Sequence, residues 1–317
     1  MSNFSEAEYL IANPDVADAV KNGHFTSGLE HYQLFGKQEN RNLVDEQKSR
    51  RYKALINCNT EGLGLEIGPS FNPIAPKSRG YNIHTLDHLS KDELKDKYKG
   101  EGVPISNIED VDFIWKGEKL ADLIGKQHCY DYILAAHVIE HVPDFISFMQ
   151  DCEKLLSTEG SLSLIIPDMR WCFDSLGEIT TTGKILDAFD SQRTCPTRGQ
   201  IFDSFANSCR LDDTISWGHE RQGKLSLIHE LEEAKDQWVK LSLEKSYIDV
   251  HCWHFIPESF SLIMSDLHYL NLTNFTIINQ HMTVGCEFFV TLSINRSFNK
   301  PMPRVDALKE IKIKLNE

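Results

Sequence analysis

The central part of the chain alternates short apolar runs with amphipathic segments. The apolar runs predict five strands, at residues 63–67, 81–86, 111–115, 130–135 and 161–166. The segments between them predict helices at 90–98, 120–124 and 144–156. Strands that alternate with helices favour a parallel sheet covered by helices, which is the arrangement of α/β domains.

The alternation ends after Pro167, where a polar region rich in histidine and aromatic residues begins. Helical periodicity is visible in this region at residues 184–190 and 227–245. We expect about residues 168–250 to form a helical insert that caps the ligand-binding edge of the sheet.

Regular structure returns at Pro257, where proline and an acid in the first turn predict a helix that continues to Tyr269. Two further strands are predicted at 275–279 and 286–294, with a short turn near Gly285 between them. These strands are expected to close the sheet as an antiparallel pair and to bring it to seven strands. Residues 299–317 are expected to form a polar C-terminal tail.

Residues 1–45 predict a separate, small helical module. Ser5 and Pro14 each begin a helical segment, Gly23 can end the second, and residues 27–35 carry apolar side chains at helical spacing. The Tyr-Leu-x-x-Asn-Pro-Asp-Val-Ala core that starts at Tyr9 resembles a module of some bacterial surface-associated and glycan-related proteins. The resemblance implies packing or docking, including docking to glycan-assembly proteins, and no chemistry.

Charge and composition narrow the classes of partner. The 317 residues include 33 basic and 47 acidic ones, which gives a formal net charge of −14. Nucleic acids and anionic membranes both require a basic surface, so neither partner is expected. No apolar run approaches the roughly 20 residues of a transmembrane helix, and no secretory signal is visible, so we expect a cytoplasmic protein. None of the eight cysteines forms a Cys-x-x-Cys pair, which favours reduced thiols.

The most informative stretch is the first predicted strand of the sheet. Residues 62–68 read Gly-Leu-Gly-Leu-Glu-Ile-Gly, so a carboxylate, Glu66, lies inside an apolar strand that ends in a glycine turn at Gly68. Asp87 follows at the predicted end of the second strand. In a doubly wound sheet, such a glycine lets the backbone approach a nucleoside, and such an acid can accept both ribose hydroxyls.

A nicotinamide-dependent dehydrogenase is the main alternative for this turn. Its Gly-x-Gly-x-x-Gly pattern would place the third glycine at Ile67, and Gly62 and Gly64 precede the strand or lie within it. Pro69 and Ser70, which follow the turn, offer a poor cradle for a pyrophosphate. The turn therefore favours a nucleoside without phosphates, which points to S-adenosylmethionine as the cofactor.

Further segments resemble a known fold family in the same order along the chain. Residues 130–142, which read Tyr-Asp-Tyr-Ile-Leu-Ala-Ala-His-Val-Ile-Glu-His-Val, resemble the strand-four motif of class I S-adenosylmethionine-dependent methyltransferases. Residues 65–69, Asp87 and residues 155–167 resemble three other motifs of that family. The resemblance implies an α/β fold with a seven-stranded Rossmann-like class I methyltransferase sheet, in a domain of residues 46–298.

Three later segments narrow the resemblance to a bacterial subgroup associated with surface-polysaccharide and glycan biosynthesis. They begin Ile-Pro-Asp-Met-Arg at residue 166, Asp-Val-His at residue 249 and Gly-Cys-Glu-Phe-Phe-Val at residue 285. The pattern departs from the commonest glycine loop of the family at Pro69 and Ser70, where further glycines would stand.

The resemblance also implies roles for individual residues at the cofactor site. It assigns the methionine end of the cofactor to Glu66 and Gly68, the ribose to Asp87, the adenine to Asp112 and Trp115, and the methyl-transfer opening to Ala136 and His137. Pro69 is expected to bind the cofactor as well. Asp112 and Trp115 can equally be a surface acid and a core aromatic residue. As a neutral imidazole at this edge, His137 could be the catalytic base that accepts a proton from the acceptor hydroxyl.

Five more residues are candidates for contacting the acceptor, namely His141, Asp168, Arg170, His251 and His254. Asp168 and Arg170 follow the fifth strand and can alternatively form a loop salt bridge. On a strand, His251 and His254 would point to opposite faces, so no metal site is expected.

The sequence thus predicts an S-adenosylmethionine-dependent methyltransferase (EC 2.1.1.-) that O-methylates a sugar or glycan hydroxyl in bacterial polysaccharide biosynthesis. The fourth strand ends in Ala-Ala-His-Val, which lacks the Asn/Asp-Pro-Pro-Tyr/Phe motif of enzymes that act on amide or base nitrogens. Two alternatives remain open: a methyltransferase for another small metabolite, and a non-catalytic, cofactor-binding scaffold in a glycan-assembly complex. The intact Glu66, Gly68 and Asp87 disfavour the scaffold.

Overall fold

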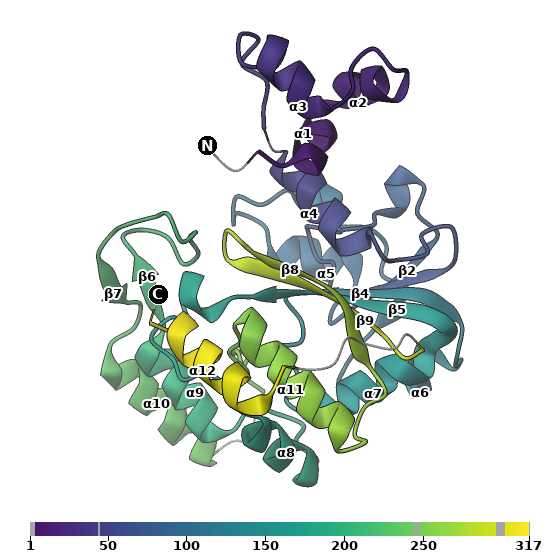
Figure 1. Ribbon diagram of the computed structural model, residues 1–317. Helices are drawn as coiled ribbons and strands as arrows, with labels where there is room; N and C mark the ends of the chain where they lie inside the picture. Colours follow the sequence, from purple (N-terminus) through teal and green to yellow (C-terminus); the bar gives the residue numbers. More distant parts are fainter. Residues whose placement is uncertain (1–3, 44, 244–246, 296–301, 317) are drawn as a thin grey trace. The chain divides into compact units, whose positions relative to one another are not determined.

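The structure is a computed structural model that describes residues 4–43, 45–243, 247–295 and 302–316. The chain divides into two compact units, residues 1–56 and 57–317 (Figure 1). The first unit extends beyond the expected module of 45 residues because the helix α4 (Glu46–Leu55) belongs to it. The expected domain end at residue 298 lies outside the described residues.

The first unit is a set of short helices packed around one tyrosine. The helices are α1 (Glu6–Ala12), α2 (Pro14–Lys21), α3 (Gly28–His31), the π-helix η1 (Tyr32–Gly36) and α4. The hydroxyl of the fully buried Tyr9 forms a 2.9 Å hydrogen bond with Nδ1 of His31. A side chain at Gly36 would collide with this hydroxyl, so the π-helix needs glycine there.

The second unit is built on a seven-stranded sheet, as the sequence predicts. Its strands are β1 (Gly64–Ile67), β2 (Ile83–Asp87), β3 (Phe113–Ile114), β4 (Tyr130–Ala136), β5 (Leu156–Pro167), β8 (Thr276–Val284) and β9 (Glu287–Ser293). They lie in the order β3-β2-β1-β4-β5-β9-β8. The first five are parallel, and β9 is antiparallel to both of its neighbours, so the expected closing pair is confirmed (Figure 1).

Helices connect the strands and bury their apolar faces. They include α5 (Lys91–Lys97), α6 (Leu120–Ile124), α7 (Phe145–Leu155) and α11 (Pro257–Tyr269). Phe145 of α7 and Phe260 of α11 are fully buried and belong to one core together with Leu164 of β5 and Phe288 of β9. This core holds the strand ends that carry the candidate site in fixed positions.

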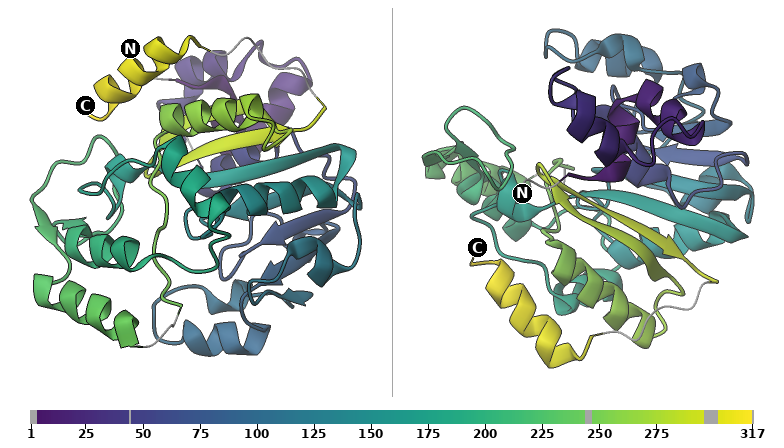
Figure 2. Two further views of the ribbon diagram at one scale, coloured as in Figure 1. Left: turned by 90° about the horizontal axis from the view of Figure 1, so that it is seen from below. Right: turned by 45° about the horizontal axis from the view of Figure 1, so that its top comes forward.

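The insert after β5 is largely helical, as expected, but it contains more structure than the sequence predicts. It consists of α8 (Thr182–Asp190), α9 (Arg198–Asn207), the two-stranded pair β6 (Cys209–Leu211) and β7 (Leu225–Leu227), and α10 (Leu231–Leu243). Both views of Figure 2 show α9 and α10 side by side. The helix α9 was not predicted; Thr197 and Gln200 form a capping box at its start.

The segment expected to be a polar tail contains the helix α12 (Arg304–Lys314). Ile311 of this helix is buried against Met169 and Ile256. All eight cysteines are free thiols, and Cys195 is the exposed one among them. None of the helices in the described part of the chain combines the length and apolar composition that a membrane span requires.

Asp168 and Arg170 form a buried ion pair where β5 meets the insert. The guanidinium donates to both carboxylate oxygens, at 2.9 Å and 2.6 Å, and Asp168 has no exposed surface. The carboxylate also accepts from the hydroxyl of Thr283 in β8, and Arg170 donates to the carbonyl oxygen of Lys314 at the end of α12. The salt bridge considered as the alternative for these two residues is therefore present, but it is buried and ties three segments together.

We expect Arg170→Met to lower the free energy of unfolding by about 3–5 kcal/mol, because it leaves the buried carboxylate of Asp168 without its counter-charge. Chemical denaturation monitored by circular dichroism measures this. The matched control is Lys184→Met, which removes a surface pair with Glu178 whose side chains are 50% and 89% exposed. That variant should change stability by at most about 1 kcal/mol. Equal effects of the two variants would contradict the proposed importance of the buried pair.

Candidate functional site

The carboxyl ends of β1 and β4 lie side by side at the point where the strand order reverses. Connections from these two strands run in opposite directions along the sheet, because β2 and β3 lie on one side and β5 lies on the other. In open α/β sheets this switch point is where ligands bind. The residues that follow the two strands, Gly68 and His137, both have left-handed backbones, with φ of 66° and 53°. Such a conformation is uncommon for a histidine and is often retained at functional sites.

The glycine turn passes close to the end of β4. A side chain at Gly68 would approach Cγ2 of Val138 to 2.9 Å, and the positive φ adds strain for any other residue. The Gly68 amide donates to the carbonyl oxygen of Leu86 in β2. The turn is therefore held against both neighbouring strands, and only glycine fits there without a shift.

Asp87 lies at the carboxyl end of β2, next to this turn, and is 2% exposed. Its carboxylate accepts from the amides of Ser70 and His88, at 3.0 Å and 2.8 Å, and pairs with Nδ1 of His88 at 2.6 Å. The hydroxyl oxygen of Ser70 is buried without a hydrogen-bond partner. Pro69, Ser70 and Asp87 border a cavity of about 10 Å³, which is the room of a single water. A nucleoside needs more space, so residues 69–73 would have to move to admit one.

Glu66, near the end of β1, is held by the β1–β2 connection. Its buried carboxylate accepts from the amides of Ile74 and Ala75, at 2.6 Å and 3.1 Å. These amides are free to donate because residues 68–82 contain no α-helix and only the short 3-10 helix η2 (Lys77–Arg79). The acid inside the strand thus holds the β1–β2 connection in place, and its expected contact with a methionine moiety stays a prediction.

Asp112 is likewise held by partners within the protein. It lies before β3, opposite Thr85, and its carboxylate accepts from the Thr85 amide at 2.7 Å and pairs with Nζ of Lys77 at 2.6 Å. Trp115 follows β3 at the carboxyl edge, but its ring lies against Phe148 and its indole N–H donates to the carbonyl oxygen of Glu118. Neither residue presents its polar group to the switch point.

His137 follows Ala136 at the end of β4 and lies between two carboxylates. Its Nε2 is 2.7 Å from Glu287 of β9, and its Nδ1 is 3.4 Å from Glu140. Burial alone would lower the pKa of His137, but the two carboxylates outweigh it and raise the pKa to about 10. The side chain remains 37% exposed, so solvent screens part of this attraction. The surroundings favour an imidazolium, and this differs from the neutral base expected from the sequence.

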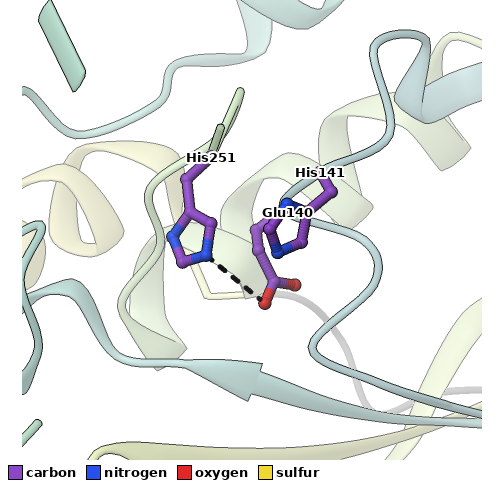
Figure 3. Close-up of side chains that lie close together, drawn as sticks. All are labelled: Glu140, His141 and His251. Carbon is purple, nitrogen blue, oxygen red and sulfur yellow. Dashed lines mark ion pairs between the residues drawn. The ribbon is translucent and has the colours of Figure 1, made fainter. Parts of the chain in front are cut away.

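Glu140, His141 and His251 converge beside His137 (Figure 3). Glu140 and His141 lie in the turn that follows β4, and His251 comes from the segment before α11. One potential ligand atom from each residue lies within 4.8 Å of the others. The Glu140 side chain has no exposed surface, and neither of its carboxylate oxygens has a hydrogen-bond partner. Burial alone would raise the pKa of Glu140, but the neighbouring histidines lower it, which keeps the carboxylate ionised.

Each of the two histidines has a carboxylate on its other side. Nδ1 of His141 is 2.9 Å from Asp249, and Nδ1 of His251 is 2.6 Å from the buried Asp174. His254 also approaches Asp174, with its Nε2 at 3.5 Å. The segment of His251 and His254 is not a strand, so the two rings meet the same carboxylate instead of pointing to opposite faces as expected.

A cavity of about 410 Å³ lies between the insert and the segment before α11. Its lining is mainly polar or charged and includes Asp174, Glu178, Lys184, Arg193, Asp203 and His254. Phe173 and Trp253 add aromatic surface, and His251 borders the cavity as well. Asp168 and Arg170 are not among its lining residues, because they bind each other. The structure thus brings His141, His251 and His254 together and leaves this ion pair apart.

Four acids of this region had no assigned role in the sequence analysis, namely Glu140, Asp174, Asp249 and Glu287. The spacing His-x-x-Glu-His at residues 137–141 is a signal that could have identified Glu140. The other three meet their histidines only through the tertiary fold.

Comparisons with known proteins give the following similarities. No protein-family model matches the chain, and no curated protein matches its sequence. Among solved structures, the chain is similar to the CcbJ methyltransferase from Streptomyces caelestis, with 12% identity, a TM-score of 0.41, and 78% of this chain and 89% of that chain covered.

Two other similar structures differ from each other in kind. A putative Zn-dependent alcohol dehydrogenase from Rhodobacter sphaeroides has 11% identity and a TM-score of 0.42, with 77% and 89% of the two chains covered. An S-adenosylmethionine-dependent methyltransferase from Mesorhizobium loti has 10% identity and a TM-score of 0.39, with 78% and 97% covered. At this level of similarity the function has to be inferred from the chain's own residues.

We expect the imidazole of His137 to titrate well above pH 6.5. The substitution Glu287→Gln should lower the pKa of His137. Because the folded pKa is raised, the pair stabilises the fold below pH 6.5 and loses this effect as the pH rises toward 10. The stability difference between the wild type and Glu287→Gln should therefore shrink as the pH rises over this range. Imidazole NMR titration and denaturation at several pH values measure both effects.

The control for this titration is Glu159→Gln, because Glu159 is exposed. It should leave the His137 pKa unchanged. An unshifted His137 pKa in the wild type would show that solvent screening cancels the attraction of the two carboxylates.

Proposed function

We propose that the protein is an S-adenosylmethionine-dependent methyltransferase that acts on a hydroxyl of a sugar or glycan. The observation that carries the proposal is the sheet itself, in which five parallel strands are followed by an antiparallel pair with β9 between β5 and β8. This is the layout that the resemblance to class I methyltransferases implies. The dinucleotide-binding sheet of dehydrogenases instead has six strands in the order 3-2-1-4-5-6.

The connection after β1 further favours a cofactor without a pyrophosphate. A dinucleotide is normally held by the N-terminus of the helix that follows the first strand. Residues 68–82 contain no α-helix, so this part of the chain has no such helix terminus to offer. The buried, unpartnered hydroxyl of Ser70 is instead a single polar group beside the acid of β2, which suits a ribose.

Several residues at this edge fit the cofactor and define its proposed contacts. Gly68 allows close approach of the backbone, Asp87 and Ser70 are suited to the ribose hydroxyls, and Ala136 borders the opening beside His137. When bound, S-adenosylmethionine supplies an electrophilic methyl group on a sulfonium centre. The protein then mainly has to align the acceptor oxygen and exclude water.

The polar cavity under the insert supports a hydroxyl-rich acceptor. Its volume of about 410 Å³ lies within the usual range of small-molecule sites, about 300–1,000 Å³. Carboxylates such as Asp203 and Glu178 can accept from sugar hydroxyls, Arg193 and Lys184 can donate to sugar or phosphate oxygens, and Trp253 offers an apolar face. A cap formed by the insert over this cavity fits the domain arrangement that the sequence predicts.

His137 is better suited to positioning neighbouring side chains than to accepting a proton. The two carboxylates around it favour the imidazolium, which is already protonated. We propose that it orients Glu140 and Glu287 next to the methyl-transfer opening. For the first unit we keep the proposal of a docking module in glycan assembly.

Asp87→Ala should weaken the binding of S-adenosylmethionine at least tenfold, because the ribose hydroxyls lose their acceptor. Isothermal titration calorimetry of the wild type and the variant measures this. The control is Asp110→Ala, which alters an exposed acid paired with Lys91, with 84% of its side-chain surface free, and should leave the affinity unchanged. Binding of NAD in place of S-adenosylmethionine would overturn the proposal and revive the dehydrogenase.

The alternatives differ in what happens after cofactor binding. A scaffold would bind the cofactor and never release S-adenosylhomocysteine with any acceptor. A panel of sugar nucleotides and oligosaccharides, set against other small metabolites, distinguishes the two kinds of enzyme by the product that carries a labelled methyl group.

Gly68→Ala should also reduce cofactor affinity at least tenfold, because the new side chain forces the turn and Val138 apart. The matched control is Gly80→Ala, another position with positive φ, where an added Cβ meets no atom within 4 Å. Both variants should lose about 1–2 kcal/mol of stability from the left-handed backbone. A loss of affinity in both, or in neither, would show that the turn does not contact the cofactor.

A further inference from the structure

We propose that Glu140, His141 and His251 bind one divalent transition-metal cation beside the acceptor cavity. The three side chains lie close together (Figure 3) and offer one carboxylate oxygen and two imidazole nitrogens within 4.8 Å of one another. Binding of the cation does not depend on the function proposed above, whereas its role toward the acceptor rests on that function.

To bind one ion, the three ligand atoms have to move toward one another. Two ligand atoms that each lie about 2.1 Å from one tetrahedral metal are about 3.4 Å apart. Oε1 of Glu140 and Nε2 of His251 are already 4.0 Å apart, and all three ligand atoms lie within 4.8 Å of one another. The ligand atoms therefore have to come closer together by roughly 1 Å.

The buried carboxylate of Glu140 is the strongest indication that a cation binds between these three side chains. Buried carboxylates normally accept several hydrogen bonds or pair directly with a cation. Both oxygens of Glu140 lack a hydrogen-bond partner, and the side chain has no exposed surface. The imidazolium of His137, at 3.4 Å, offsets part of its charge, and the ring of His251 lies at 4.0 Å, but neither ring donates a hydrogen bond to it.

The outer carboxylates orient the two imidazoles as metal ligands usually are. A histidine that binds a metal commonly gives its other N–H to a carboxylate, which fixes the tautomer and the ring orientation. The carboxylate of Asp249 accepts a hydrogen bond from Nδ1 of His141, and the carboxylate of Asp174 accepts one from Nδ1 of His251. Each ring is thereby left with Nε2 for the cation. Two independent histidines with this same arrangement are hard to explain as packing alone.

Two tertiary contacts hold the ligand segments in register. The amides of Cys252 and Trp253 both donate to the carbonyl oxygen of Glu140, at 2.7 Å and 3.2 Å. The indole N–H of Trp253 donates to the carbonyl oxygen of Val142 at 2.6 Å. His251 is therefore fixed next to the turn that carries the other two ligands.

The donor set indicates the class of metal and its use. Imidazole nitrogens suit zinc, iron, cobalt and nickel, whereas magnesium and calcium prefer oxygen ligands. Three protein ligands leave at least one position open, as in catalytic zinc sites. His141 retains 30% side-chain exposure and His251 borders the acceptor cavity, so an acceptor hydroxyl or a water can reach the open position. The cation would thus position the acceptor oxygen for methylation.

The test uses full-length protein stripped of metal with a chelator and then titrated with Co²⁺, whose visible absorption reports imidazole ligation. We expect one equivalent to bind to the wild type and Zn²⁺ to displace it, with Mg²⁺ competing at least tenfold less well. Glu140→Gln, which preserves the size of the side chain, and His251→Ala should each weaken binding more than tenfold. Asp249→Asn, an exposed position, should weaken it about 10–100-fold through the orientation of His141.

The matched control is His254→Ala, which removes a histidine of the same segment that also approaches Asp174 but is not a proposed ligand. It should bind Co²⁺ within about threefold of the wild type. Circular dichroism checks the fold of each variant, and Asp249→Asn decides the matter if the two ligand variants do not fold.

Three outcomes would overturn the inference: no stoichiometric binding by the wild type, unchanged binding in the ligand and Asp249 variants, or a loss in His254→Ala equal to that in His251→Ala. Calorimetry of S-adenosylmethionine binding on the same preparations keeps the two proposals apart. Cofactor binding without Co²⁺ binding would reject the cation alone, and the reverse result would reject the methyltransferase alone.

Discussion

The candidate site depends on one backbone carbonyl group, that of Glu140. Its oxygen accepts hydrogen bonds from the amides of Cys252 and Trp253. These hydrogen bonds join the turn after β4 to a segment that follows the whole insert. Through them the chain returns to the end of the sheet after an excursion through α8, α9 and α10. This junction places His251 beside Glu140 and His141, while Asp174 contacts both His251 and His254 from the insert side.

Charge balance explains why the region around this junction is so rich in paired groups. Glu140 and Asp174 are both buried, and the ionised form of a buried carboxylate is costly unless positive charge or hydrogen bonds lie close by. Burial alone would raise the pKa of each, yet histidines lower both. Glu287 and Asp249 then balance the histidines from the outside. Carboxylates and imidazoles thus alternate from β9 to the insert.

The sequence was most informative where one physical requirement acts alone. Buried parallel strands must be continuous apolar runs, so β1, β2 and β4 were predicted within one or two residues of their observed bounds. The helices α6 and α11 begin and end at the predicted residues; the left-handed Gly125 follows the first, and Pro257 starts the second. The helix α9 lacks a strong apolar stripe: it buries Ile201, and its packing on α10 could not be foreseen from local pattern.

The roles of individual side chains were harder to predict, because a buried polar group can be satisfied in more than one way. An acid inside an apolar strand must have a partner, but the sequence does not say whether the partner is a ligand or the protein. For Glu66 the partners are two backbone amides, available because no helix forms after β1. For His251 the decisive partners are Asp174 and Glu140, both distant in sequence. Only a contact between remote segments could reveal them.

Asp174 has a further consequence, because it touches a ring on each side of itself. His251 belongs to the proposed cation site, and His254 lines the acceptor cavity. A molecule in the cavity that draws His254 away leaves Asp174 to His251 alone, so the two sites are connected through one carboxylate. Thermodynamic linkage makes such an influence mutual: if the acceptor strengthens cation affinity by some factor, the cation strengthens acceptor affinity by that same factor. The order in which the acceptor and the cation are added would then not change the final complex. The presence of either one would lower the concentration at which the other binds.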